Sequence, residues 1–223
     1  MHIKTSDLPV MNLGFGDYTC NWGTHFCGIY ETEAERDTVM YNFLAMGVQD
    51  KALLVCCPCE CCHDKAEEKI SSLAPDFNPD DKDSFKLLRP AELYYPDGIF
   101  SPQHILKAHD DIWADNLRDF RKNVRGTADM SWAREKVPGV ENLMAYESLL
   151  NTFIWEKQWI SICLYDVNIF PGSMIMKVLQ VHPFVITGGG VFENPYFVQP
   201  EQWLAKYAPE YLGVLKAQNE VVA

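Results

Sequence analysis

The chain has 223 residues, a formal net charge of −12 and 48% hydrophobic residues. This length suits one α/β domain with a substantial core, and the hydrophobic content excludes an intrinsically disordered chain. The acidic balance excludes a general nucleic-acid binder, because such proteins need a basic surface to neutralise phosphates.

The sequence also carries signals about the compartment. No apolar run reaches the roughly 18 residues that a membrane-spanning helix needs, and the amino terminus lacks the basic and apolar regions of a signal peptide. We therefore expect a cytoplasmic protein that binds neither membranes nor, directly, nucleic acid. In that compartment the eight cysteines are expected to be reduced thiols, metal ligands or redox groups rather than structural disulfides.

The first predicted elements are an arm, a strand and a helix. Residues 1–22 are rich in Gly, Asn and Asp without a clear period, which predicts a mobile or draping arm with a short element near Leu13. The apolar run 24–30 predicts a strand. Thr32 is the expected N-cap of a helix over residues 31–46, and Gly47 is its expected C′ residue.

The rest of the chain continues this alternation. The compact apolar run 51–56 is typical of a buried parallel strand, and a helix between two such strands predicts a right-handed βαβ unit. Further helices are expected at 64–73, 101–117, 141–157, 174–181 and 200–211, and further strands at 85–88, 124–129, 159–165 and 184–186. The predicted fold is α/β, a three-layer sandwich with a mostly parallel central sheet, in one domain over residues 23–223.

Polar residues follow several predicted strands directly. Because the carboxyl ends of parallel strands meet at one edge of a sheet, and ligands collect at that edge in open α/β sheets, these residues predict a pocket there. The residues concerned are Tyr30, Glu31, the range 57–63, the range 129–132 and Asp166.

Several separated motifs resemble one known family. They are His25-Phe-Cys-Gly-Ile-Tyr30 with the following 31–36, Gly126-Thr-Ala-Asp129-Met130-Ser-Trp132-Ala133, Tyr146-Glu147, Cys163-Leu-Tyr165-Asp166, Val181-His182-Pro183 and Glu193-Asn194-Pro195-Tyr196. In order and spacing they resemble MEDS, the methanogen/methylotroph DcmR sensory domain, over roughly residues 22–205.

The resemblance implies a prokaryotic sensory domain, similar in layout to RecA/KaiC-like ATPases but without a working nucleotide site. It implies a ligand among small hydrocarbon derivatives, such as halogenated or methylated one-carbon compounds. The sequence agrees that ATP is not expected, because no G-x-x-x-x-G-K-[ST] motif is present and the glycines at 188–190 lack the required Lys. The sequence contains neither the helix-turn-helix nor the histidine kinase that often accompanies this domain in the family. We therefore expect a stand-alone sensor that signals to a partner protein or transcription regulator. Either a monomer or a homodimer is compatible with the sequence.

Eight residues are the candidates for lining the ligand pocket. His25 and Cys27 share one strand face, as do Cys163 and Tyr165 on a later strand. Glu147 lies close to the buried stripe of its helix, where a carboxylate needs a partner such as His25 or Arg125. The alternative to a ligand-binding role is that each residue simply packs in the core. The full set is His25, Cys27, Tyr30, Asp129, Trp132, Glu147, Cys163 and Tyr165.

A cysteine run forms a second candidate site. Thiolates bind soft and borderline metals, so the run predicts a Zn or Fe–S site, although its overlapping C-x-x-C pairs lack the usual second pair elsewhere in the chain. A thiol redox switch and a variable Cys-rich loop are the alternatives. The candidate metal ligands are Cys56, Cys57, Cys59, Cys61, Cys62 and His63.

An enzyme is the least favoured class. Cys27 or Cys163 paired with His25 or His182 would make a Cys-His nucleophile, but no nucleophile elbow or comparable signature surrounds them. His182-Pro183 is interpreted as the end of a helix and the start of a strand. We therefore expect a ligand sensor rather than a Cys-dependent small-molecule enzyme.

Overall fold

The computed structural model describes residues 10–118, 123–155 and 157–222. Its strands are β1 (Val10–Asn12), β2 (Thr19–Asn21), β3 (His25–Tyr30), β4 (Leu53–Cys57), β5 (Phe85–Leu87), β6 (Val124–Asp129), β7 (Trp159–Asp166), β8 (Phe184–Thr187) and β9 (Gly190–Glu193). Its α-helices are α1 (Glu33–Gln49), α2 (Ala66–Leu73), α3 (Pro90–Tyr94), α4 (Pro102–Arg118), α5 (Leu143–Ile154), α6 (Gly172–Val181), α7 (Pro200–Tyr207) and α8 (Leu212–Val222). Short 3-10 turns η1 (Glu60–Lys65), η2 (Met130–Arg134), η3 (Val140–Asn142) and η4 (Pro209–Tyr211) join them.

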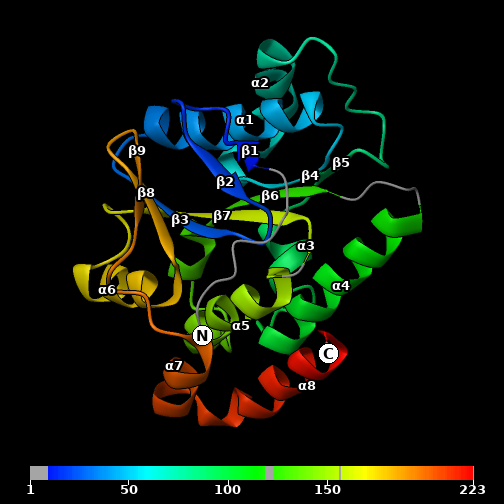
Figure 1. Cartoon of the computed structure of the whole chain (residues 1–223). Helices are drawn as coiled ribbons and strands as arrows, with labels where there is room; N and C mark the ends of the chain where they lie inside the picture. The colour runs from blue at the N-terminus through cyan, green and yellow to red at the C-terminus, as the bar shows by residue number, and fades with distance from the viewer. Residues whose placement is uncertain (1–9, 119–122, 156, 223) are drawn as a thin grey trace.

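A seven-stranded sheet forms the middle layer, in the order β5-β4-β6-β7-β3-β8-β9. Every described pairing in it is parallel except β8 with β9. Helices α1 and α2 cover one face, and α5 lies against the other with α4, α6, α7 and α8 around it (Figure 1). The predicted three-layer α/β sandwich with a mostly parallel sheet is confirmed.

The central strands are buried on both faces, as parallel sheets require. Every residue of β4 and of β6 is buried. Side-chain alternation then divides the core into two clusters, one under α1 and α2 and one under the helices of the opposite face. Neighbouring residues of one strand therefore belong to different cores, and Cys56 packs on the α1 side while Cys57 packs on the α5 side.

Helix α1 begins as predicted but ends later. The Thr32 side chain accepts a hydrogen bond from the backbone N–H of Glu35, and the Glu35 side chain accepts from the Thr32 backbone, which is a capping box. The prediction that Gly47 ends the helix was wrong, because α1 continues to Gln49. Gly47 is required for close packing instead: a Cβ there would lie 2.5 Å from Leu54 Cδ2 and 2.7 Å from Arg125 Cδ.

The ends of the chain are more ordered than the sequence pattern predicted, beyond the short element expected near Leu13. Strands β1 and β2 form a hairpin in the expected arm, and Leu13 is fully buried beside it in the α1-side core; residues 1–9 lie outside the described part. The predicted helix 200–211 is divided into α7 and η4, and α8 follows it. Within the described ranges, no helix is both long enough and apolar enough to cross a bilayer.

Candidate functional site

Four side chains with metal-binding atoms meet on the face of the sheet that α5 covers. They are His25 on β3, Glu147 on α5, Cys163 on β7 and His182 directly after α6, and each is at most 2% exposed. One ligand atom from each lies within 4.8 Å of all the others. We call these four residues the buried quartet.

Strand alternation and register bring the sheet's two members of the quartet together. On β3, His25 and Cys27 point to the α5 side, and on β7, Cys163 and Tyr165 do the same. The two strands are parallel neighbours with Cys27 opposite Cys163. These four predicted pocket residues therefore share one patch of the sheet.

The quartet's short distances centre on the carboxylate. Glu147 Oε2 lies 3.2 Å from His25 Nε2 and 3.4 Å from His182 Nε2. His25 Nε2 also lies 3.5 Å from Cys163 Sγ. For ligand bonds of about 2.0 to 2.3 Å, the edges of a tetrahedron around Zn²⁺ are about 3.3 to 3.8 Å long, so these spacings suit an ion at the centre.

Outer hydrogen bonds orient two of the four groups. His182 Nδ1 lies 2.8 Å from the carbonyl oxygen of Val178, so Nδ1 carries the proton and Nε2 presents a lone pair to the quartet. The Tyr165 hydroxyl donates to Glu147 Oε1 at 2.8 Å, which leaves Oε2 for the centre. Metal sites use outer partners of these kinds to fix a histidine tautomer and a carboxylate.

Three atoms of the quartet remain without a hydrogen-bond partner among the described residues. They are His25 Nδ1, Glu147 Oε2 and His182 Nε2, and all three are buried. Such atoms are rare in folded proteins, because leaving a buried polar group unpaired costs roughly 1 to 3 kcal/mol. Glu147 Oε2 faces His182 Nε2 at 3.4 Å, and both are acceptors when His182 Nδ1 carries the proton; His25 Nε2 lies 3.2 Å from the same oxygen but outside hydrogen-bond geometry.

The electrostatics of the site depend on burial. Burial and the neighbouring His182 lower the pKa of His25 to about 4. Burial alone would raise the pKa of Glu147, but the imidazoles of His182 and His25 hold its pKa below the ordinary value. Burial and Glu147 raise the pKa of Cys163 well above its ordinary range. Without a further cation the site thus contains a carboxylate beside a neutral imidazole and a thiol.

Three predicted pocket residues lie elsewhere. The Tyr30 hydroxyl donates to Asp129 Oδ2 at 2.8 Å at the carboxyl edge of the sheet, where Arg36 Nη1 lies 3.9 Å from the same oxygen. Trp132 stacks on Tyr94 with ring centroids 4.7 Å apart. The structure therefore divides the eight residues into five on the α5 side, a Tyr-Asp pair at the edge and one aromatic cluster.

The predicted cysteine site is also divided. Cys59 and Cys62 form a disulfide, which differs from the expectation of reduced thiols, and the Cys61 thiol lies 3.1 Å and 3.6 Å from their respective sulfurs. Cys56 and Cys57 point to opposite faces of the sheet and lie outside this group. His63 is likewise outside the group and contacts Asp64, with Nδ1 3.3 Å from Oδ1.

The sequence interpretation missed His182 as a site residue and left the partner of Glu147 open. His182 was interpreted as a helix end and as a possible base in the least favoured, enzymatic alternative, yet its ring lies 4.2 Å from that of His25, centroid to centroid. Arg125, the other partner considered for Glu147, pairs with Asp50 and packs against Phe43 on the opposite face. The motif Val181-His182-Pro183 was the available signal for His182.

A further buried histidine, His109 on α4, gives a test of the pH dependence of folding. Its Nε2 lies 2.9 Å from the Tyr146 hydroxyl, and burial lowers its pKa from the ordinary value of 6.5 to about 4. Between those pH values the unfolded chain binds a proton that the folded chain does not. Stability should therefore fall as pH falls from 6.5 to 4, with about 3 kcal/mol of the loss due to His109.

Urea denaturation from pH 4.5 to 7.5 measures this effect. The His109→Gln variant is expected to show a shallower loss of stability than wild type, and the matched control His104→Gln, an exposed residue of the same helix, should follow wild type. Equal slopes for His109→Gln and wild type would contradict the assignment.

Two clefts lie at opposite edges of the sheet. The first, of about 300 Å³, is at the carboxyl edge beside β3 and the start of α1, and its lining is mainly apolar. The second, of about 570 Å³, lies at the start of β4 and is more polar. Residues lining the first include Gly28, Ile29, Tyr30, Ala34, Val39 and Ile186.

Comparison with protein families identifies the chain. The model of MEDS, the methanogen/methylotroph, DcmR sensory domain, matches residues 24–183. Comparison with curated proteins gives no match. The matched range contains all four residues of the buried quartet and covers most of the 223 residues. The chain belongs to the MEDS family of sensory domains.

Proposed function

We propose that this chain is a sensory protein in which the buried quartet holds a divalent transition-metal ion such as Zn²⁺, and that occupancy of this site controls a surface read by a partner protein. The observation that carries the proposal is the convergence of four ligand atoms, each from a different segment, within 4.8 Å in a fully buried site. Imidazole, thiolate and carboxylate are the ligands that Zn²⁺ and its neighbours in the first transition series accept.

The charge of the site supports a cation. Glu147 is fully buried, and its nearest partners are the imidazoles of His25 and His182 and the hydroxyl of Tyr165. An isolated buried carboxylate is costly, and breaking its pairing typically costs about 3 to 5 kcal/mol. A divalent ion would compensate the carboxylate and the Cys163 thiolate together, leaving a neutral centre.

The ligand count indicates a closed site. Structural Zn²⁺ sites use four protein ligands, whereas catalytic sites keep one position for water or substrate. The quartet supplies four ligands, so the ion would join elements of the fold rather than activate a substrate. This favours a sensor over an enzyme.

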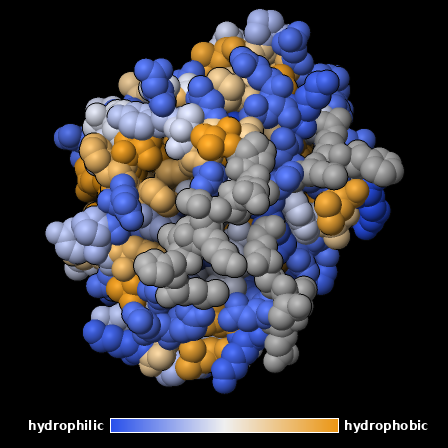
Figure 2. Space-filling model, viewed as in Figure 1, coloured by the Kyte–Doolittle hydropathy of each residue, from blue (hydrophilic) through white to orange (hydrophobic). Residues whose placement is uncertain are grey.

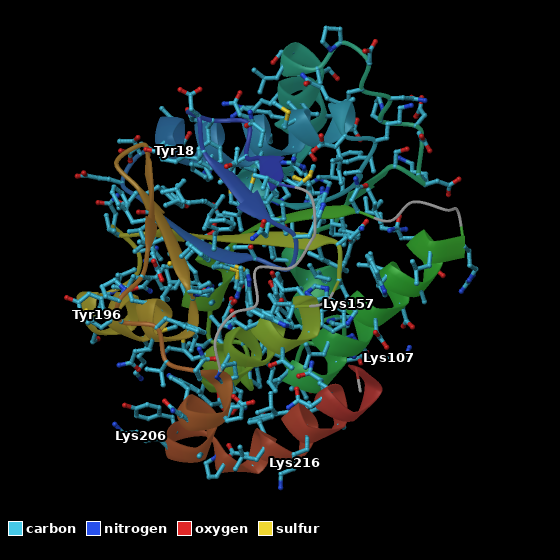
Figure 3. All side chains as sticks on the ribbon, viewed as in Figure 1. Tyr18, Lys107, Lys157, Tyr196, Lys206 and Lys216 are labelled. Carbon is cyan, nitrogen blue, oxygen red and sulfur yellow. A yellow bond between two sulfur atoms is a disulfide. The ribbon has the colours of Figure 1, made fainter. Side chains whose placement is uncertain are left out.

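The placement of His182 suggests how occupancy would reach the surface. His182 lies between α6 and β8, and its carbonyl accepts a hydrogen bond of 2.7 Å from Asn194, just after β9. The adjoining surface exposes large apolar side chains: Met176 is 46%, Phe192 53% and Tyr196 58% exposed. Figure 2 shows hydrophobic residues on the β8–β9 side of the molecule, and Figure 3 shows Tyr196 on the outer surface near α6. A bound ion would fix this surface to the sheet.

Hydrogen exchange tests the proposed signal. Zn²⁺ added to the metal-free chain is expected to slow amide exchange in α6 and in β8–β9, because His182 becomes tied to three other elements. The Glu147→Gln variant should show no such protection, while Glu141→Gln, an exposed residue before the same helix, should behave as wild type. Protection that persists in Glu147→Gln, or protection absent from wild type, would overturn the proposal.

A second candidate for the sensed ligand is a small organic molecule bound in the cleft at the carboxyl edge of the sheet. The apolar lining of this cleft favours it, since apolar concave sites are what small hydrophobic ligands bind. Both the cleft and the quartet include residues of β3, but the cleft lies on the α1 side of that strand and the quartet on the α5 side. Small halogenated or methylated one-carbon compounds are the ligand class that the family resemblance implies.

A thermal-shift series with dichloromethane and methanol tests this candidate. Stabilisation of wild type that is lost in Ala34→Phe, which places a ring in the cleft, would support it. Glu33→Phe is the matched control, because Glu33 is also exposed but does not line the cleft. A shift that is the same in wild type and Ala34→Phe would rule out the cleft as the binding site.

A further inference from the structure

A second group of sulfur atoms lies at the surface, apart from the buried quartet. Cys59, Cys61 and Cys62 come together because η1 turns tightly after β4. Their sulfurs all lie within 4.8 Å of one another, and Cys61 is exposed while its two neighbours are 7% exposed. We call these three residues the cysteine trio.

We propose that the reduced cysteine trio is a three-thiolate binding site for a soft, thiophilic monovalent ion, Cu⁺. Thiolates select soft ions, and among the first-row candidates these are Cu⁺, Zn²⁺ and Fe–S clusters. A closed Zn²⁺ site takes four protein ligands and an Fe–S cluster is held by four, but among the described residues no fourth His, Cys, Asp or Glu joins this group. A Zn²⁺ ion here would need water as its fourth ligand. Three-coordinate Cu⁺ is the ion whose usual geometry the trio satisfies.

A buried guanidinium supports the accumulation of negative charge at this site. Arg36 is 5% exposed, and its Nη1 lies 3.5 Å from Cys59 Sγ. Three thiolates and one Cu⁺ carry a net charge of −2, so a fixed neighbouring cation favours the loaded state. The other two guanidinium nitrogens of Arg36, Nε and Nη2, bond Asp37 Oδ1 at 3.0 Å and 2.9 Å, so Arg36 is held in place beside the trio.

The Cys59–Cys62 disulfide must be reduced before Cu⁺ can bind. A dithiol reductant supplies two electrons and two protons to the Cys59–Cys62 disulfide, giving two thiols, and is itself oxidised to a disulfide. Cu⁺ then replaces the protons of the three thiols, which are released to solvent. The exposed Cys61 gives both the reductant and the ion a route to the site.

The trio is also placed to influence the carboxyl edge of the sheet. Arg36 Nη1 lies 3.9 Å from Asp129 Oδ2, which accepts the Tyr30 hydrogen bond. Cys59 is therefore connected through Arg36 and Asp129, by three successive contacts, to Tyr30, which lines the first cleft. This coupling does not depend on the ion proposed for the buried quartet.

The test uses the full chain with the thiol of the quartet removed by Cys163→Ser, reduced and kept under anaerobic conditions. Cu⁺ is titrated against bathocuproine disulfonate, a coloured Cu⁺ chelator. We expect the protein to take one equivalent of Cu⁺ from the chelator. Adding Cys61→Ser should weaken Cu⁺ binding by more than about 100-fold. Loss of an outer partner typically costs about 10- to 100-fold, and Cys61 is proposed as a direct ligand. Adding Cys20→Ser, a cysteine outside both groups, should change nothing.

A second measurement does not depend on any variant. One equivalent of Cu⁺ should protect Cys61 of the reduced wild-type chain from alkylation by iodoacetamide, and one equivalent of Zn²⁺ should protect it less. The proposal is overturned if no Cu⁺ is taken from the chelator, if Cys61→Ser binds Cu⁺ as tightly as its parent, or if Zn²⁺ protects Cys61 as well as Cu⁺ does.

Discussion

Zn²⁺ in excess is expected to raise the melting temperature of the metal-free chain by about 5 to 10 °C. An ion present at 100 times its Kd stabilises the folded state by about 2.7 kcal/mol. In a chain of this size each kcal/mol shifts Tm by about 2 to 4 °C. The physical source of the gain is the replacement of unpaired buried atoms at Glu147 and His182 by coordination bonds.

Matched glutamate variants separate this gain from nonspecific effects of Zn²⁺. Glu147→Gln keeps the size of the side chain but removes the charge at the centre of the quartet, so the gain should disappear. Glu141→Gln removes an exposed carboxylate from η3 and should keep the full gain. If Glu147→Gln keeps more than half of the gain, the ion binds elsewhere.

Tyr165→Phe is expected to weaken Zn²⁺ binding by about 10- to 100-fold, the range typical of lost outer partners. The Tyr165 hydroxyl holds Glu147 Oε1 at 2.8 Å, so its removal frees the carboxylate to rotate away from the centre. The side chain is otherwise unchanged, and the fold should persist because the ring still packs in the core.

A competition titration with a chromophoric Zn²⁺ chelator measures that change. Tyr41→Phe is the control, because Tyr41 is a buried tyrosine on the opposite face whose hydroxyl has no hydrogen-bond partner among the described residues. Equal affinities for Tyr165→Phe and wild type would show that the hydroxyl does not position Glu147.

Much of the quartet could be predicted from the sequence because it depends on local periodicity. The two-residue spacing of His25 and Cys27, and of Cys163 and Tyr165, fixes their faces in any strand. The apolar stripe of α5 places Glu147 near the core. Periodicity does not show which strands become neighbours in the sheet. Here β3 pairs with β7, which is far from it in the sequence.

The remaining residues show where that reasoning stops. Asp129 and Trp132 follow β6, so the edge rule grouped them with the pocket, but Asp129 contacts Tyr30 and Arg36 at the edge and Trp132 packs among aromatic rings. His182 approaches the site from a helix–strand junction, where neither the helical nor the strand period applies. The quartet consequently lies on a face of the sheet rather than at its carboxyl edge.

The cysteine run shows the same limit. Adjacent strand residues point to opposite faces, which separates Cys56 from Cys57. The 3-10 turn that follows brings Cys59, Cys61 and Cys62 together, because its shorter period returns the chain within three residues. The number of cysteines was visible in the sequence, but the end of β4 decides which of them meet.

The absorption spectrum of the Co²⁺-loaded chain tests the central claim most directly. Two imidazoles, one carboxylate and one thiolate in a tetrahedron predict intense visible d–d bands and a near-ultraviolet thiolate-to-Co²⁺ charge-transfer band at one equivalent of Co²⁺. Cys163→Ser should abolish the charge-transfer band and Cys61→Ser should keep it. A pale octahedral spectrum for wild type, or a charge-transfer band that survives in Cys163→Ser, would contradict a metal site built from His25, Glu147, Cys163 and His182.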